Sequence, residues 1–328
     1  MATKRLKRVG LCPETLERCQ RQHILTCSAY ELWSAKKKHF LPLSLPELDQ
    51  VLHGGIPLGT ITEIAGPAGC GKTQFSIMLS VLATVPVEMG GLGGAVVYID
   101  TESAFSAERL VEVAQNRFPG HFISEESLLQ LTSRVHVYHE STSSQLLKRL
   151  QTLEEDIIEK KVKLIILDSV ASLVRKEFDS RTSQNLYERT NLLAKEAAIL
   201  KYLAESFYIP VVVTNQITTR FGFNLSEVDV MEKEDSVTSS ENGYVTAALG
   251  NTWSHSVNTR LIIQYLDDRY RQILIAKSPV APFAAHEYDI QDKGIVLKCN
   301  GARQYEGTDP GLQQIRVRTS LQKECFPT

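Results

Sequence analysis

The stretch of this chain that most constrains its fold is GPAGCGKTQF, residues 66–75. It contains Gly66, four further residues, and then Gly71, Lys72 and Thr73. The β-rich segment TITEIAG precedes it, and the apolar helical segment KTQFSIMLSVLATV follows. Such glycines let backbone N–H groups converge on an anion, and the amino end of the helix adds a positive dipole end. The pattern predicts a phosphate-binding loop between a strand and a helix, and therefore an α/β fold.

The residues of this loop have separate chemical tasks. Lys72 would place its charge on the β- and γ-phosphates, and the Thr73 hydroxyl would be a ligand for Mg²⁺. The full set of residues predicted to line the nucleotide within the loop is Gly66, Pro67, Ala68, Gly69, Cys70, Gly71, Lys72, Thr73 and Gln74. A nucleoside triphosphate with Mg²⁺ is therefore the expected ligand.

Four apolar segments without internal alternation are separated by helical segments. The strands are TITEIAG, AVVYID, KLIILD and IPVVVTNQ; the helices include SAERLVEVAQNRF, SSQLLKRLQTLEEDIIEK and one over about 186–207. Strands that are apolar throughout indicate a parallel sheet buried on both faces. Nearer the C-terminus, TRLIIQYL and RQILIAKS around DDRY predict an antiparallel hairpin, and HEYDI with KGIVLKC predicts a further pair.

The pattern divides the chain into four parts. We expect residues 1–40 to form a helical segment and residues 41–58 to form a linker with a short helix. Residues 59–298 carry the strand and helix pattern, whereas 299–328 have no periodicity and are expected to be disordered. Residues 218–245 also lack periodicity, and an unstructured segment of this length inside a domain is usually functional or disordered.

Three polar residues follow the predicted strands at their carboxyl ends, where open α/β sheets bind ligands. Asp168 ends LIILD and would orient the magnesium ion; the alternative is a strand-end cap. Glu102 lies two residues beyond AVVYID and would polarise an attacking water; the alternative is an exposed loop glutamate. Gln216 ends VTNQ and would sense the γ-phosphate; the alternative is a turn residue.

Composition excludes several classes of protein. The formal net charge is −2, so there is no global basic field and any nucleic-acid contact must use local patches. The six cysteines form no CxxC pair, which disfavours a disulfide framework. No apolar run approaches the roughly 20 residues needed to cross a bilayer, so no membrane role is expected.

The N-terminal residues leave alternatives open. Cys12, Cys19, His23 and Cys27 are close in sequence, but their spacing matches no common zinc pattern, and unliganded side chains are the simpler interpretation. The basic start MATKRLKRVG has no apolar stretch behind it, so it is not a secretory signal. It is a nuclear address, a DNA-contacting tail or a solvated tail with neither role.

Five segments together resemble the RecA-type recombinases in their eukaryotic branch: GPAGCGKTQF, VVYIDTESAFSAERL, LIILDSVASLVRKEF, VVVTNQITT and ALGNTWSHSVNTRL. The resemblance covers roughly residues 43–298. It implies a RecA-type P-loop ATPase core with a mainly parallel central sheet flanked by helices and a C-terminal antiparallel hairpin. It also implies a nuclear, ATP- and Mg²⁺-binding ATPase of homologous recombination and double-strand-break repair. The implied partners are single-stranded or branched DNA and, in a hetero-oligomer, other recombinase paralogues: the C-type nearest, then the D-type and the X-ray-repair member.

The resemblance also assigns roles to individual positions. Lys72 and Thr73 match the phosphate and magnesium residues, Asp168 the Walker B carboxylate, Glu102 the water-activating carboxylate and Gln216 the γ-phosphate sensor. Arg109 matches the residue that stacks on adenine, and His255 a residue near the neighbouring subunit's nucleotide. Residues 175–181 match the first DNA-facing loop of the family, and 218–250 match the second.

The chain departs from the family pattern in its N-terminal part. Residues 4–27 resemble only the first half of the family's helical DNA-binding domain, and no Phe-x-x-Ala polymerisation motif follows. A splice form, a lineage-specific shortening and a mispredicted exon would each produce this pattern. We therefore expect N-terminal duplex binding and ordinary filament growth to be altered.

Charge distinguishes the two candidate DNA-facing loops. Residues 218–245 hold six acids against two bases, which should repel phosphates. Arg175, Lys176 and Arg181 around Phe178 offer charge and a stacking ring, so DNA contact is predicted there; the alternative is a solvated turn. Lys277, in IAKSPVAP, stands where many eukaryotic members carry an acidic residue. It would reach a neighbouring subunit's phosphates, and the alternative is simple surface exposure.

Three functions remain to be weighed. The first is a DNA-stimulated ATPase subunit of a repair complex, favoured by intact Lys72, Glu102 and Asp168. The second is a nucleotide-gated scaffold that holds partner paralogues with little hydrolysis, favoured by the missing polymerisation motif and the acidic segment. The third is a small-molecule kinase. It is disfavoured because a long segment follows TNQ and no arginine-rich lid is evident.

Overall fold

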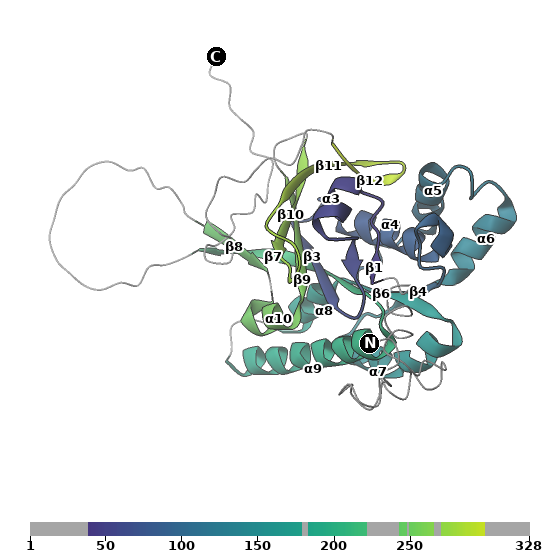
Figure 1. Cartoon of the computed structure of the whole chain (residues 1–328). Helices are drawn as coiled ribbons and strands as arrows, with labels where there is room; N and C mark the ends of the chain where they lie inside the picture. Colours follow the sequence, from purple (N-terminus) through teal and green to yellow (C-terminus); the bar gives the residue numbers. More distant parts are fainter. Residues whose placement is uncertain (1–38, 179–182, 222–242, 248, 266–269, 299–328) are drawn as a thin grey trace, which may run out of the picture. The chain divides into compact units, whose positions relative to one another are not determined.

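A computed structural model of the 328-residue chain describes residues 39–178, 183–221, 243–247, 249–265 and 270–298 (Figure 1). The chain divides into two units, Met1–Phe40 and Leu41–Thr328. The predictions for the N-terminal segment, apart from its last two residues, and for the tail 299–328 lie outside the described residues.

The second unit is built on one large sheet. Its strands run in the order β12-β11-β10-β9-β3-β7-β6-β4-β5, with β8 paired to β7. They are β3 (Ile61–Gly66), β4 (Ala95–Asp100), β5 (Val135–His139), β6 (Val162–Asp168), β7 (Val211–Phe221), β8 (Gly243–Ala247), β9 (Thr259–Tyr265), β10 (Arg271–Lys277), β11 (Ala285–Gln291) and β12 (Gly294–Leu297). From β5 to β9 the neighbours are parallel, and from β9 to β12 they are antiparallel. The predicted fold class is confirmed.

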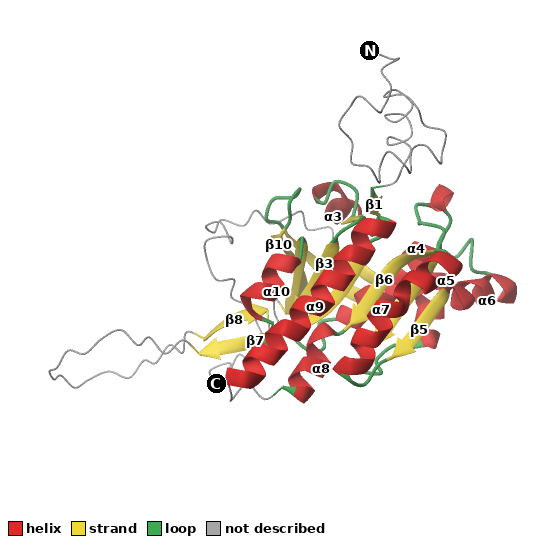
Figure 2. Cartoon of the chain, turned by 90° about the horizontal axis from the view of Figure 1, so that it is seen from below, coloured by secondary structure: helices red, strands yellow, loops and turns green. Residues whose placement is uncertain are grey.

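Helices cover both faces of this sheet (Figures 1 and 2). On one face lie α3 (Pro46–Val51), α4 (Lys72–Thr84), α5 (Ala107–Arg117) and α6 (Glu125–Arg134); on the other lie α7 (Ser143–Glu159), α8 (Val170–Glu177), α9 (Ser183–Phe207) and α10 (Gly250–Ser256). The short elements β1 (Phe40–Leu41), β2 (Ile56–Pro57) and the 3₁₀ turn η2 (Val87–Met89) complete the described part.

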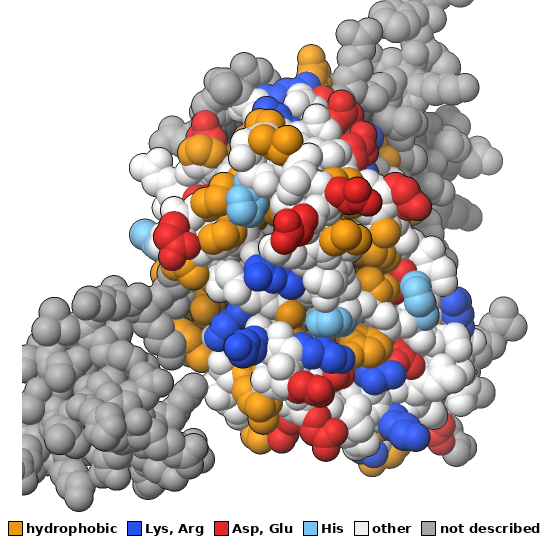
Figure 3. All heavy atoms as spheres, turned by 90° about the vertical axis from the view of Figure 1, so that its right-hand side faces the viewer, with side chains coloured by type: hydrophobic (Ala, Val, Ile, Leu, Met, Phe, Trp, Pro, Cys, Tyr) orange, Lys and Arg blue, Asp and Glu red, His pale blue; other side chains and the backbone are white. Residues whose placement is uncertain are grey.

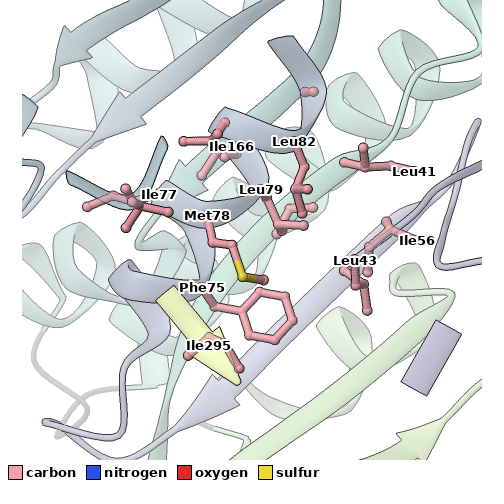
Figure 4. Packing of buried hydrophobic residues seen from close by; sticks show 14 of the residues in the cluster. Leu41, Leu43, Ile56, Phe75, Ile77, Met78, Leu79, Leu82, Ile166 and Ile295 are labelled. Carbon is pink, nitrogen blue, oxygen red and sulfur yellow. The ribbon is translucent and has the colours of Figure 1, made fainter. Parts of the chain in front are cut away.

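The continuous apolar strands explain this layering. Successive side chains of a strand point to opposite faces, so Val96 and Tyr98 of β4 join one core while Val97 and Ile99 join the other. In the first core, α4 packs Phe75, Met78, Leu79 and Leu82 near Ile166 of β6 and Ile295 of β12 (Figure 4). The predicted linker region 41–58 also contributes to this core, through the buried side chains of Leu41, Leu43, Leu45, Leu48, Leu52 and Ile56.

Two elements differ from the sequence prediction. β7 does not end at Gln216 but continues to Phe221 and pairs antiparallel with β8, so that Ile217 faces Ala247. The aperiodic segment 218–245 is therefore partly strand, and residues 222–242 lie outside the described part. In addition, residues that were expected in a loop belong to the helix α8, which begins two residues after Asp168.

One face of the described part agrees with the near-neutral net charge. On the face shown in Figure 3, acidic, basic and hydrophobic side chains are interspersed, and no single type dominates. Within the described ranges, no helix combines the length and apolar character needed to span a bilayer.

Candidate nucleotide-binding site

The loop between β3 and α4 has the backbone of an anion cradle. Gly69 has a φ of 78°, and Gly71, the N-cap of α4, has a φ of 96°. A Cβ atom at Gly69 would lie 2.6 Å from Tyr265 Oη, and one at Gly71 would lie 2.6 Å from Ile290 Cδ1. The left-handed backbone therefore favours glycine at both positions, and a larger residue would also make the side-chain ends of Tyr265 and Ile290 shift.

Lys72, the first residue of α4, lies over this loop. Its Nζ donates hydrogen bonds to the carbonyl oxygens of Gly66 at 3.0 Å and Pro67 at 2.9 Å. Burial lowers the pKa of Lys72, while the nearby Asp168 carboxylate opposes that change. The amine is held at the mouth of the loop, where it can turn toward a bound phosphate.

Asp168 lies at the end of β6, almost fully buried, with three hydroxyls around its carboxylate. Thr73 and Tyr98 each donate to Oδ2 at 2.7 Å, and Thr214 donates to Oδ1. Burial, and to a smaller extent the negative charge of Asp168, raises the pKa of Tyr98 well above its ordinary value. The phenol therefore keeps its proton and donates it to a hydrogen bond. The two predicted magnesium residues, Thr73 and Asp168, are thus in direct contact.

This donor set suits magnesium. Among the described residues, no cluster of three or more histidine, cysteine or carboxylate side chains could hold a metal ion. Mg²⁺ is usually bound through one or two protein oxygens, with phosphates and waters completing its octahedron, so Thr73 and Asp168 fit it without a further protein ligand.

Glu102 is hydrogen-bonded to the residue that follows β6 and to a residue of β7. Its Oε1 accepts hydrogen bonds from Ser169 Oγ and, at 3.1 Å, from Gln216 Nε2. The turn that carries Glu102 is fixed by the buried Asp100, whose carboxylate accepts the backbone N–H of Glu102 at 3.0 Å and that of Phe105 at 2.9 Å. The predicted water-activating and sensing residues are therefore brought together.

A pocket of about 390 Å³ opens beside this pair and is lined by Glu102, Ser172, Arg175, Lys176 and Gln216. Arg175 Nη1 donates to Gln216 Oε1. Burial, and to a smaller extent the charge of Arg189, lowers the pKa of Arg175.

The structure corrects one detail of the predicted DNA-contacting loop. Arg175 and Lys176 lie in the last turn of α8 and not in a loop. Phe178 follows α8, is partly buried and packs against the core beneath α7 to α10; its stacking on a base stays a prediction. Arg181 lies outside the described residues.

Arg109, on α5, borders the opposite side of the loop. Its Nε donates to Gln74 Oε1 at 2.7 Å, and Nη2 donates to the Gln291 carbonyl at 2.6 Å, with an ion pair to Glu112. Its guanidinium therefore lies between α4, α5 and the β11–β12 turn. This position is next to the phosphate loop, and the contact of Arg109 with adenine stays a prediction.

The remaining loop residues differ in their exposure. Pro67 and Cys70 are buried, whereas Ala68 and Gly69 are exposed. Burial raises the pKa of the Cys70 thiol to about 11, so it stays protonated. The Cys70 carbonyl accepts a hydrogen bond from the buried Tyr288 hydroxyl of β11, which ties the loop to the antiparallel part of the sheet.

His255 and Lys277 lie apart from this group. His255 is exposed near the end of α10. Lys277 Nζ donates to the Ser254 carbonyl at 2.8 Å and to the Val257 carbonyl at 2.6 Å, which caps the carboxyl end of α10. Burial, and to a smaller extent the positive charge of Arg260, lowers the pKa of Lys277.

Sequence analysis missed Tyr98, Thr214 and Ser169. A signal was available for the first two, because each is a polar residue within an apolar strand, close to its carboxyl end. In a parallel sheet those ends meet at one edge, so such residues are candidates for contact with the strand-end carboxylates.

Comparisons with known proteins match this arrangement. The family model described as Rad51 matches residues 41–297. The chain is 51% identical to the human protein named DNA repair protein RAD51 homolog 2, over 91% of this chain and 90% of that protein. It is 49% identical to the mouse protein of the same name, over 91% and 99%, and 30% identical to bovine DNA repair protein XRCC3, over 78% and 74%. GLGGAVVYIDTESAFSAERLVE and AALGNTWSHSVNTRL resemble the B-type recombinase paralogue in particular, and the names of the first two relatives agree.

Proposed function

The chain belongs to the Rad51 family of DNA repair and recombination proteins, and on that premise we propose that it is an ATP-binding, DNA-stimulated ATPase subunit of a recombinase-paralogue complex. It would act in homologous recombination and double-strand-break repair in the nucleus. Its partners would be other paralogues of the family, the C-type nearest, followed by the D-type and the X-ray-repair member. Single-stranded or branched DNA would be the nucleic-acid ligand.

One observation carries the proposal. Thr73 and Asp168 are 95 residues apart in sequence, yet their side chains are joined by a 2.7 Å hydrogen bond at the mouth of the loop that holds Lys72. A hydroxyl, a carboxylate and an ammonium in this arrangement are the protein groups of a magnesium–triphosphate site. Thr73 and Asp168 would hold Mg²⁺, which when bound neutralises charge on the phosphates.

The other residues divide the remaining tasks. Lys72 would leave the Gly66 and Pro67 carbonyls and donate to the phosphates. Glu102 would orient and deprotonate the attacking water, since its carboxylate faces the pocket. Gln216 bridges Glu102 and Arg175, so it is placed to relay the state of the nucleotide site to α8, where the candidate DNA-contacting cations lie.

Calorimetric titration of the folded chain with ATP and Mg²⁺ tests the site. We expect binding by the parent chain, none by Lys72→Ala, and unchanged binding by Lys201→Ala, which alters an exposed lysine of α9. ATP turnover by the complex with its paralogues, with and without single-stranded DNA, then tests the activity. No heat of association in a well-folded complex would refute the proposal.

The second candidate is a nucleotide-gated scaffold that hydrolyses little ATP. It is supported by the hydrogen bonds that Ser169 and Gln216 make to the Glu102 carboxylate. A carboxylate that already accepts these donors would activate a water slowly. Glu102→Gln separates the two candidates. In an ATPase subunit it abolishes turnover by the complex and leaves nucleotide binding intact, whereas in a scaffold it changes neither turnover nor partner binding.

A further inference from the structure

A carboxylate lies within β3, a strand whose residues are all buried. Glu63 is fully buried, one residue before Ile64 and three before the phosphate-binding loop begins at Gly66. An ionised carboxylate in such a place is strongly unfavourable unless it is paired and hydrogen-bonded. Its partners therefore indicate which elements this strand must hold.

Three donors from three different elements meet at Glu63. Asn215 Nδ2 of β7 donates to Oε1 at 2.6 Å, and Trp253 Nε1 of α10 donates to the same oxygen at 2.9 Å. Arg260 of β9 donates to Oε2 and lies opposite Glu63 in the strand register. One carboxylate thus joins both strands that flank β3 to a helix on the face of the sheet.

Each donor is coupled to a part of the candidate site or its surroundings. Asn215 directly precedes Gln216, the candidate γ-phosphate sensor. Trp253 is buried in α10, the short helix that also carries the exposed His255 (Figure 1). Arg260 Nη2 donates to Ser254 Oγ at 3.1 Å, a second contact to the same helix.

Asn215 is the informative member of the cluster. Arg260 alone can balance the charge of Glu63, so an asparagine amide is not needed for neutrality. The Asn215 Oδ1 atom has no hydrogen-bond partner among the described residues, although it is buried. The Asn215 side chain therefore links β7 to Glu63 through one bond, at the cost of an unsatisfied oxygen.

We propose that Glu63 is a positioning residue that ties the end of β7 to α10, so that occupancy of the nucleotide site sets the position of the α10 surface around His255. This rests on the proposed function, since it requires a nucleotide at the phosphate-binding loop. A shift of Gln216 toward the nucleotide moves Asn215, and through Glu63 it moves Trp253.

Amide hydrogen exchange of residues 249–257, with and without ATP and Mg²⁺, tests the coupling in the full-length chain. In the parent chain the nucleotide should slow exchange by about fivefold, the effect of one hydrogen bond. In Asn215→Ala this response should be lost while nucleotide affinity changes by less than about threefold. Faster exchange in both states with the response retained is what a merely structural role would give, and it would overturn the proposal.

Two further variants complete the test. Asn258→Ala is the matched control, because it removes a 3.2 Å hydrogen bond from Ile61 of β3 to the segment just after α10 without touching Glu63; it should keep the response. Trp253→Phe keeps the buried ring and removes only the N–H donor, so it severs the same link if Asn215→Ala does not fold. A parent chain that binds no nucleotide refutes the proposed function, and with it the coupling. A parent chain that binds nucleotide with no change at 249–257 refutes the coupling alone.

Discussion

Glu196 lies in the apolar stripe of α9, between Leu193 and Leu200, and none of its side chain is exposed. Neither carboxyl oxygen has a hydrogen-bond partner among the described residues. Burial, with a smaller contribution from Glu177 at the end of α8, raises the pKa of Glu196 to about 8. The folded chain therefore keeps this side chain protonated at neutral pH, while the unfolded chain ionises it.

The sign and size of the effect follow from proton linkage. Below the ordinary value of 4.5 both states are protonated, so the ionisation of Glu196 adds no pH-dependent penalty. As pH rises from 4.5 to about 8, only the unfolded state gains charge, so stability falls. Because one pKa unit is worth about 1.4 kcal/mol, the full difference corresponds to about 5 kcal/mol above pH 8. Between about pH 6 and about pH 8 the loss is about 2 kcal/mol.

Urea denaturation of the parent chain and of Glu196→Gln at these two pH values measures the loss of stability caused by Glu196. Glutamine keeps the shape but does not ionise, so its stability advantage over the parent chain should grow by about 2 kcal/mol from about pH 6 to about pH 8. Other titrating groups cancel in this difference. Glu205→Gln is the control, because Glu205 is an exposed glutamate of the same helix, near Lys201. A pH-independent difference for Glu196→Gln would show that the buried carboxyl titrates normally and would refute the reasoning.

Other side chains allow shorter tests. Arg175→Ala combined with Lys176→Ala should weaken single-stranded DNA binding by the complex and reduce its logarithmic salt slope by about 1.4, while neutralising acids within 218–245 should not; unchanged affinity would move the DNA site elsewhere. Lys277→Ala should lower ATP turnover by the mixed complex about tenfold or more without weakening ATP binding by the isolated chain, and equal turnover would rule out a trans contact. Arg117→Ala removes the donor to four backbone carbonyls and should lower the free energy of unfolding by about 3 kcal/mol in urea; a change below about 0.5 kcal/mol would contradict this.

The sequence was sufficient for the features that depend on local pattern. The glycine spacing from Gly66 to Gly71 predicts the loop, and apolar runs that end in Asp100 and Asp168 predict parallel strands with carboxylates at one edge. The structure has this sheet and brings Thr73 and Asp168 into contact. The roles of these residues in binding and hydrolysis stay predictions.

Features that depend on register or on distant partners could not be predicted in the same way. Tyr98 meets Asp168 only because β4 and β6 align Asp100 with Asp168, and a slip by one residue would turn the phenol to the other face. β7 extends to Phe221 because it pairs with β8. This pairing could not be predicted, since more than 20 residues separate the two strands in the sequence. α8 was missed because its β-branched valines have weak helix propensity, which the burial of Val170, Leu173 and Val174 overrides.

Four buried carboxyl groups differ in their hydrogen bonds: three of them hold elements around the site in place, and one only lowers stability. Asp100 and Asp168 accept backbone or hydroxyl donors at the carboxyl edge of the sheet, and Glu63 accepts three donors beneath it. Glu196 receives none from the described residues, and it lies on α9, which packs on the face of the sheet opposite to α4. A buried carboxylate is tolerated when hydrogen-bond donors surround it, so the loss of Asp100, Asp168 or Glu63 should leave buried donors unpaired. Replacing Glu196 should instead relieve the chain, and this contrast assigns positional roles to Asp100 and Glu63 that neither residue's place in the sequence indicates.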